Sequence, residues 1–123
     1  MPKQFDESLL NQLNTIEEID IETRSATGRT HRTTTWVVVV NKDVYVRSVR
    51  GRSGHWYQEI TANPQGAIYM DGRRLSVQAI PITDPATIGR VSNAYPQKYR
   101  NSPFVISIVR EEILPTTLRL EPA

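Results

Sequence analysis

The hydrophobic pattern of the chain changes its period near residue 19. Apolar residues first recur at helical spacing, at Phe5, Leu9, Leu10, Leu13 and Ile16. This spacing predicts an N-terminal helix within residues 1–18. Residues 19–25 then alternate between apolar and charged side chains, which predicts a strand with one wet face. The dipeptide Thr27-Gly28 predicts a turn after that strand.

The next segments predict β-hairpins. Residues 32–40, RTTTWVVVV, are β-branched or aromatic almost throughout and predict one long strand. Four consecutive valines leave this strand no polar face, so a helix or a second subunit must cover its outer side. Asn41-Lys42-Asp43 predicts a short connection to a strand over 44–49. Asp71-Gly72 predicts a second hairpin, between strands at 67–70 and 73–80.

Short helices and a last strand complete the pattern. Residues 55–62 predict a helix that Asn63-Pro64 ends. Asp84-Pro85 opens a helical segment over 84–112, and residues 115–121 predict a closing strand. The chain therefore reads as one domain, 1–123, of mainly β (α+β) class. We expect six antiparallel strands, closed or partly closed into a barrel, with three or four short helices.

Composition excludes several kinds of chemistry. The 123 residues include no cysteine, which excludes thiol catalysis, disulfides and Cys-ligated metals. The two histidines, His31 and His55, lie 24 residues apart and form no His-x-x-x-His motif, so no metal site is expected. No apolar run approaches the roughly 20 residues needed to span a bilayer. We expect a cytoplasmic protein without membrane contact.

The charge becomes informative when it is followed along the chain. The formal net charge is only +2, but residues 1–22 carry −5, residues 23–110 carry +9, and residues 111–123 carry −2. Twelve of the 15 cations are arginines. Since the guanidinium fork can hold phosphate or carboxylate with two hydrogen bonds, the central segment indicates an anionic partner. A solvated, charge-balanced surface is the alternative.

The densest cluster of basic residues lies in residues 47–57. Arg47, Arg50 and Arg52 alternate with small residues where a strand ends and a helix begins. Gly51 and Gly54 allow close approach of the backbone, and the helix that begins at His55 offers free N–H groups. Together these features predict a loop that binds an anion such as phosphate.

Aromatic and polar residues could complete a pocket beside this loop. Trp56 and Tyr57 could stack on a flat ring, although core packing is the favoured alternative for Trp56. On the strand predicted over 32–40, Arg32, Thr34 and Trp36 share one face by two-residue alternation. They could border the same pocket, or Arg32 could simply lie at a wet strand end.

Four short motifs carry a resemblance to a known superfamily: Thr27-Gly28-Arg29, Arg50-Gly51, Trp56-Tyr57 and Ala62-Asn63-Pro64. In this order they resemble the split-barrel flavoproteins of the pyridoxamine-phosphate-oxidase type. The nearest branch is that of the deazaflavin-dependent nitroreductases, whose turn is one residue longer. The chain, including residues 114–119, is also similar to an uncharacterised domain family of the same superfamily. The resemblance covers residues 20–120.

The resemblance implies a six-stranded split β-barrel, usually a homodimer, with FMN or a deazaflavin near the subunit interface. Barrel strands and a phosphate-loop helix would occupy residues 19–80. The implied function is an oxidoreductase that transfers a hydride to a small-molecule substrate. No catalytic residue is assigned, because the cofactor brings its own chemistry. The candidate cofactor-binding residues are Arg32, Thr34, Trp36, Arg47, Arg50, Gly51, Arg52, His55, Trp56 and Tyr57.

Two other functions are compatible with the same residues. A split barrel without a cofactor could bind a small anion through its arginines. A small basic barrel could also bind single-stranded nucleic acid by stacking and backbone contacts. The aromatic content of 7% argues against nucleic acid, because such binding needs aromatic residues dispersed along an exposed sheet face.

Overall fold

The structure of the protein, a computed structural model, describes residues 3–123. The strands are β1 (Ile19–Arg24), β2 (Thr30–Thr35), β3 (Val38–Val40), β4 (Asp43–Val46), β5 (Gln65–Met70), β6 (Arg73–Pro81) and β7 (Leu118–Pro122). The α-helices are α1 (Glu7–Thr15), α2 (His55–Ala62), α3 (Pro85–Lys98) and α4 (Val105–Ile108). Two 3₁₀ turns, η1 (Gly51–Ser53) and η2 (Glu111–Thr116), complete the set.

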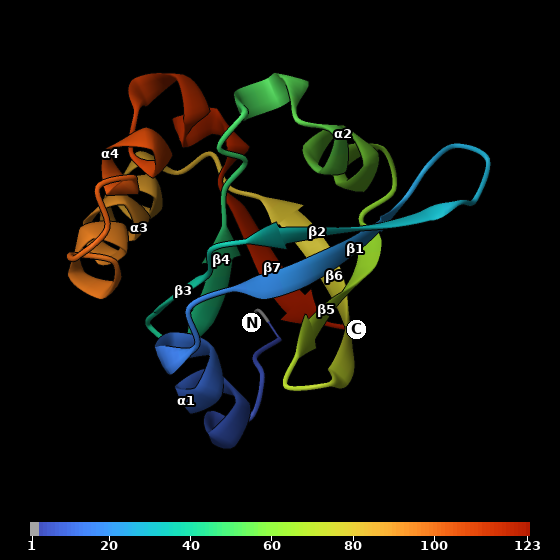
Figure 1. Ribbon diagram of the computed structural model, residues 1–123, viewed down its shortest axis with the longest axis horizontal. Helices are drawn as coiled ribbons and strands as arrows, with labels where there is room; N and C mark the ends of the chain where they lie inside the picture. Colours follow the sequence, from blue (N-terminus) through green and yellow to red (C-terminus); the bar gives the residue numbers. More distant parts are fainter. Residues whose placement is uncertain (1–2) are drawn as a thin grey trace.

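The strands form one antiparallel sheet that curls into a barrel. Their order is β2-β1-β5-β6-β7-β4-β3, so β2 and β3 are its two edges. These edges are consecutive in the chain, and two residues, Trp36 and Val37, join them. The barrel is therefore closed on this side by chain connectivity rather than by a ladder of hydrogen bonds, as Figure 1 shows. This is a split barrel, as the resemblance implied.

The number of strands corrects the sequence-based expectation. The segment 32–40 was expected to be one strand, but it is divided at Trp36-Val37, so the sheet has seven strands instead of six. Its first part pairs with β1, from Thr30↔Arg24 to Thr35↔Ile19, and its second part pairs with β4. One straight strand cannot pair with both β1 and β4, because these strands are separated by β5, β6 and β7 in the curled sheet.

The division leaves the backbone of Val37 without strand partners inside the protein, where Val37 is fully buried. The hydroxyl of Tyr99 accepts from the Val37 N–H (3.1 Å) and donates to the Glu17 carbonyl (2.7 Å). The ammonium of Lys98 donates to the carbonyls of Val37 (2.7 Å) and Leu13 (2.8 Å). We call this set of contacts the seam, because it ties the two sheet edges to the ends of α1 and α3.

Helices cover both the ends and one side of the barrel. The buried faces of α1 and α2 pack into the barrel core, with Leu13 and Ile60 fully buried. They lie below and above the strands in Figure 1. A second core lies outside β3 and β4, where Val38 and Tyr45 pack against Val91 of α3 and its neighbours. Helices therefore cover the valine run, and that run gives no argument for a dimer.

The local signals of hairpins and caps are confirmed. Asn41 and Lys42 both have positive φ (51° and 69°), as a two-residue turn between twisted strands requires. The pair Asp71-Gly72 behaves in the same way (51° and 75°). Asp84 caps α3 by accepting from the Thr87 N–H (3.0 Å).

The segment after α3 differs from its expected form. The helical segment 84–112 consists of α3, the single turn α4 and the start of η2, and the closing strand begins at Leu118 instead of residue 115. Pro115 lies within η2, and the hydrogen bond from the Thr117 N–H to the Leu114 carbonyl (3.2 Å) continues this 3₁₀ turn up to the start of the strand. None of the described helices is long and apolar enough to cross a membrane.

The seam makes a testable contribution to stability. Tyr99→Phe removes the hydroxyl and leaves the buried N–H of Val37 without an acceptor, so the free energy of unfolding should fall by about 2 kcal/mol. Urea unfolding followed by circular dichroism measures this loss. Tyr57→Phe is the matched control, because the structure gives the half-buried Tyr57 hydroxyl no hydrogen bond within residues 3–123. Equal effects of the two substitutions would contradict the role of the seam.

Candidate functional site

An open cleft lies directly beside the seam, on the side of Trp36. It has a volume of about 340 Å³. Its walls come from the end of β2, from the segment after β4 and from α4. The lining residues are Glu18, Thr34, Thr35, Trp36, Val49, Phe104, Ser107 and Ile108. We call this space the seam cleft.

The indole of Trp36 belongs to one wall of the seam cleft. Its ring stacks on Tyr99 with centroids 4.0 Å apart and an interplanar angle of 4°. Tyr99 is held in turn by its hydrogen bonds to Val37 and Glu17. The seam therefore fixes the orientation of an aromatic ring at the edge of an open space, and no movement is needed to present it.

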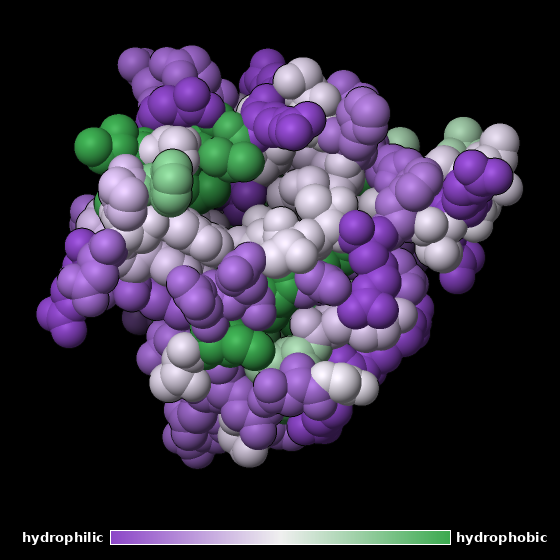
Figure 2. Space-filling view, in the orientation of Figure 1, coloured by the Kyte–Doolittle hydropathy of each residue, from purple (hydrophilic) through white to green (hydrophobic). Residues whose placement is uncertain are grey.

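Large apolar side chains are exposed around the seam cleft. Val49, Phe104 and Ile106 have 49%, 70% and 71% of their surface exposed. Figure 2 shows hydrophobic side chains gathered over α4, at the upper left, beside a hollow in the surface. Exposed apolar patches on folded proteins commonly mark a place where a ligand or a partner binds.

The segment after β4 forms an ordered turn beside this cleft. The Ser48 N–H donates to Thr116 Oγ1 (3.0 Å), and the Ser48 hydroxyl donates to the Gly51 carbonyl (2.7 Å). Gly51 has φ +70°, and a Cβ at Gly54 would lie 2.5 Å from Ser48 Oγ. Both glycines are therefore required by the backbone path that leads from β4 into α2.

Arg50 and Arg52 project from this turn into solvent. Both are exposed, and neither forms an ion pair within residues 3–123. Arg50 directly follows Val49, which lines the seam cleft. Two uncompensated guanidinium groups next to an apolar cleft make the surroundings attractive to an anion.

Arg47 has a different role from the expected one. Its side chain is fully buried. The guanidinium donates to Thr117 Oγ1, Ser92 Oγ and the carbonyls of Ile88 and Ile108, at 2.9–3.2 Å. Burial lowers its pKa, although the Tyr95 ring, 5.5 Å away, acts in the opposite sense. Arg47 joins β4 to α3, α4 and η2, so the expectation that it contacts a cofactor is corrected.

Arg32 and Thr34 are held by an acid on the neighbouring strand. Arg32 pairs with Asp20 (3.0 Å) and lies over the Tyr69 ring (3.6 Å to the centroid). Thr34 donates to the same Asp20 carboxylate (2.8 Å). Thr34 lines the seam cleft, but Arg32 is not among its lining residues. The stripe expected along one strand face is therefore divided, and Thr34 and Trp36 remain together.

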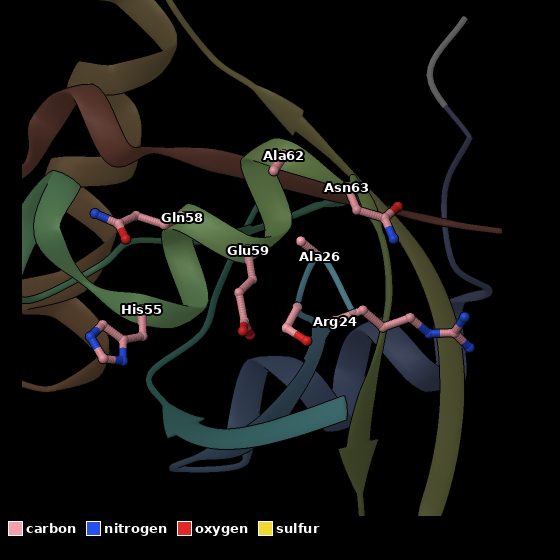
Figure 3. A pocket seen from close by; sticks show the side chains of 8 residues that line it. Arg24, Ala26, His55, Gln58, Glu59, Ala62 and Asn63 are labelled. Atoms are coloured by element: carbon pink, nitrogen blue, oxygen red, sulfur yellow. The ribbon is translucent and has the colours of Figure 1, made fainter. Parts of the chain in front are cut away.

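The three residues at the start of α2 also separate. Trp56 is buried in the barrel core, which confirms the alternative favoured for it, and the half-buried Tyr57 packs against the same core. His55 is exposed and lines another cavity, of about 620 Å³. This cavity lies between α2 and the β1–β2 arm, the hairpin formed by β1, β2 and the turn that joins them. Figure 3 shows His55 and Glu59 on α2 and Arg24 on β1 around this cavity.

Glu59 organises the side of that larger cavity. Its carboxylate accepts from Thr23 Oγ1 (2.6 Å) and lies 2.9 Å from His31 Nδ1. Burial tends to raise the pKa of Glu59, but the hydrogen bonds from Thr23 and His31 outweigh it and hold the pKa below its usual range. Within residues 3–123, no three His, Asp or Glu side chains are grouped to hold a metal ion. The contacts of Glu59 tie the β1–β2 arm to α2.

Sequence reasoning did not identify the residues that α4 contributes to the seam cleft. Phe104, Ser107 and Ile108 lie in a segment that was only expected to be helical. One signal was present. Residues 103–109 are apolar except for Ser107. The apolar side chains of one helical turn point in all directions, and only one face can pack against the protein, so some of them must be exposed.

Comparison with known proteins places the chain in a family. Residues 9–120 match the family described as "Uncharacterized protein conserved in bacteria (DUF2255)". The chain belongs to this family. Among curated proteins, none matches its sequence.

Solved structures share the fold of this DUF2255 protein. The crystal structure of HutZ, the heme storage protein of Vibrio cholerae, superposes with a TM-score of 0.72 at 11% identity, covering 98% of this chain and 91% of HutZ. A putative pyridoxamine 5′-phosphate oxidase from Listeria innocua gives 0.65 at 12% identity, with 95% and 90% coverage. A protein titled F420 reductase gives 0.64 at 14% identity, with 97% and 96% coverage. The fold is the pyridoxamine-phosphate-oxidase-like split barrel.

The structural role of Arg47 in this DUF2255 protein is testable against Arg50. Arg47→Met removes the donor to four acceptors, in two buried and two partly buried contacts, and the free energy of unfolding should fall by about 3 kcal/mol. Arg50→Met makes the same chemical change at an exposed position three residues away and should change stability by no more than about 0.5 kcal/mol. Chemical denaturation of the two variants makes the comparison. Similar losses would contradict the assignment of Arg47 to the interior.

Proposed function

We propose that this protein binds a flavin-type cofactor, FMN or a deazaflavin, at the seam cleft and acts as an oxidoreductase that transfers a hydride to or from a small molecule. The observation that carries the proposal is the seam cleft itself. It is an open space of about 340 Å³ with a fixed indole in its wall and exposed apolar side chains at its rim. Ligand sites of this size are typically apolar with a few polar groups that fix orientation.

The residues around the cleft fit the parts of such a cofactor. Trp36, Val49 and Phe104 offer apolar surface to a flat ring system. The Thr35 hydroxyl offers a hydrogen bond to its polar edge, and the hydroxyl oxygens of Thr34 and Ser107, whose protons go to Asp20 and to the Phe104 carbonyl, can accept one. Arg50 and Arg52 offer charge and hydrogen bonds to a phosphate, whereas the N–H of the buried Gly51 already donates to the Ser48 carbonyl (2.9 Å).

The same residues argue against heme at this cleft. Heme iron is usually held by the side chain of His, Cys, Met or Tyr. None of the described residues that line the seam cleft is of these types. His55 lines the other cavity, between α2 and the β1–β2 arm. A ligand held by stacking and hydrogen bonds suits the cleft better than one held by a metal bond.

The protein itself would bind and orient rather than supply acids or bases. A flavin or deazaflavin supplies the hydride chemistry when it is bound. Trp36 would fix the plane of the ring, because its own orientation is set by Tyr99. Arg50 and Arg52 would bind the anionic tail. The exposed rim of Val49 and Phe104 would exclude water from one side of the ring.

A module without a cofactor is the second candidate. The supporting observation is that Arg50 and Arg52 are uncompensated whether or not a ring occupies the cleft. In that case the protein would bind a small anion such as phosphate at the turn before α2. The distinction is experimental, because only the first candidate requires an aromatic ring to contact Trp36.

We also propose that the protein is a homodimer whose subunits meet at the exposed apolar side chains of α4 rather than at the valine run. Phe104 and Ile106 are exposed beside the seam cleft, and α4 has only one turn to hold them there. Burying such side chains against a second copy would remove apolar surface from water. A dimer of this kind would also cover one side of the cofactor.

The cofactor is tested by titrating the purified protein with FMN and with a deazaflavin. Binding should perturb the visible spectrum of the ring and quench tryptophan fluorescence, since Trp36 lines the cleft. Arg50→Ala should weaken affinity by about 1.5–3 kcal/mol, the range for hydrogen bonds to a charged group. No spectral change and no heat of binding with either cofactor would overturn the proposal.

Matched variants locate the site. Arg73→Ala is the control for Arg50→Ala, because Arg73 is an exposed arginine that follows the β5–β6 turn and lines no part of the cleft. It should leave the affinity unchanged. Phe104→Ala should weaken binding of the flavin but not of inorganic phosphate. Phosphate binding that needs Arg50, without any flavin binding, would favour the cofactor-free candidate.

The oligomeric state is tested by measuring the molar mass in solution. Sedimentation or light scattering should give twice the chain mass of 14.0 kDa. Ile106→Asp, which places a charge on the exposed patch without touching either core, should shift the mass toward the monomer. A mass of 14.0 kDa at every protein concentration would refute the dimer.

A further inference from the structure

A second cleft lies on the opposite side of the seam, between α1 and α3. Its volume is about 250 Å³, and it is lined by Asn14, Val38, Val39, Ala94, Gln97 and Lys98. It shares no lining residue with the seam cleft. Of these lining residues only Lys98 is ionisable, and Asn14 and Gln97 contribute neutral amides. We call it the lysine cleft.

The amine of Lys98 has an unusual set of partners. Its Nζ donates to the carbonyls of Leu13 (2.8 Å) and Val37 (2.7 Å). Beyond the bond to Cε, a tetrahedral nitrogen has three positions, and these two hydrogen bonds use two of them. Within residues 3–123, no carboxylate forms an ion pair with Lys98. The third position holds either a proton without an acceptor or a lone pair.

The burial of Lys98 favours the neutral amine, which has a lone pair, over the charged ammonium. Burial lowers the pKa of Lys98 to about 8. A lysine that is partly desolvated and lacks a counter-ion is the kind that acts as a nucleophile in proteins. The structure uses Lys98 to pair two carbonyls, and a neutral amine keeps both of those hydrogen bonds.

The edge of β3 adds polar groups to the lysine cleft. Val40 and Asp43 flank the two-residue turn and form the hydrogen-bonded pair, and such pairs alternate along antiparallel strands. The N–H and C=O of Val39 therefore point away from β4, toward the edge that no strand covers. Val39 lines the lysine cleft, so a bound molecule with a carbonyl oxygen finds a backbone donor beside the amine.

We propose that Lys98 is a nucleophilic amine that forms an imine with a small aldehyde bound in the lysine cleft. The lone pair of Nζ attacks the aldehyde carbon, and a proton moves from nitrogen to oxygen to give a carbinolamine. The hydroxyl takes a proton from solvent and leaves as water while the C=N bond forms, and the protonated imine keeps one N–H for one of the two carbonyls, of Leu13 or Val37. Nothing is oxidised or reduced, and addition of water reverses the reaction.

The size and polarity of the lysine cleft define the class of ligand. A volume of about 250 Å³ suits a short-chain or single-ring aldehyde rather than a cofactor. The apolar sides of Val38, Val39 and Ala94 suit a hydrocarbon body. The neutral amides of Asn14 and Gln97 suit an uncharged carbonyl oxygen. This site is independent of the flavin-type cofactor proposed at the seam cleft.

Reductive trapping tests the proposal on the full chain. The protein is incubated with butanal and cyanoborohydride at pH 7.5, and the alkylated lysines are identified by peptide mass spectrometry. The chain offers an internal comparison, because its only other lysines are Lys3 and Lys42. Lys98 should be alkylated at least about tenfold faster than either, since burial lowers the pKa of Lys98 to about 8 and a substantial share of its amine is neutral at this pH. The N-terminal amine is mapped separately.

Two substitutions on α3 test whether the cleft is needed. Ala94→Leu fills the lysine cleft and should slow alkylation of Lys98 at least about tenfold, with Lys3 and Lys42 unchanged. Ala86→Leu adds the same atoms at an exposed position of α3 and should have no effect. Alkylation of Lys98 no faster than that of Lys3 and Lys42 overturns the proposal. So does an Ala94→Leu variant that folds and is labelled at the wild-type rate.

Discussion

The backbone of Val37 imposes the constraint on which the rest of this structure depends. A strand that pairs with β1 must leave it and join β4, and at the crossing its N–H and C=O have no strand partner. Buried backbone groups without partners are costly, so they must be paired by other means. Tyr99 and Lys98, adjacent at the end of α3, supply the acceptor and the donor. The position of α3, the covering of the valines and the stacking of Trp36 all follow from these two side chains.

Sequence reasoning succeeded where the deciding signal was local. Residues 55–62 form a helix because Gly54 precedes it and Asn63-Pro64 ends it, and both signals lie within a few residues. Asn41-Lys42 and Asp71-Gly72 set their hairpins in the same way. The division at Trp36-Val37 was missed because nothing near it interrupts a run of β-branched residues. Its cause is Tyr99, 62 residues further along the chain.

In the basic central segment, too, sequence reasoning failed where the deciding contacts are distant in the chain. Alternation along β4 places Arg47 on one face of the strand, but it does not show whether solvent or protein lies there. The partners of Arg47 come from residues 41–70 positions away, so only the fold reveals that the guanidinium is internal. Arg32 and Arg74 pair with Asp20 and Glu22 of β1, where the acidic N-terminal segment compensates them. The net charge of +9 over residues 23–110 thus overstates what remains for a ligand. Arg50 and Arg52 are two of the exposed arginines that form no ion pair within residues 3–123, and they lie in the turn that precedes α2.

The seam also explains why openings lie on both of its sides. In an uninterrupted strand over residues 30–40, each residue would have a ladder partner, and side chains would alternate between core and surface without a gap. The division instead lets Trp36 turn toward Tyr99 on one side, while Val38 and Val39 face α1 and α3 on the other. Tyr99 stacks on Trp36, and its ring lies 5.2 Å from the Lys98 amine. The residues that satisfy the broken ladder are therefore the same residues that shape the walls of both clefts. A substitution that removes the need for the seam would therefore also alter both clefts.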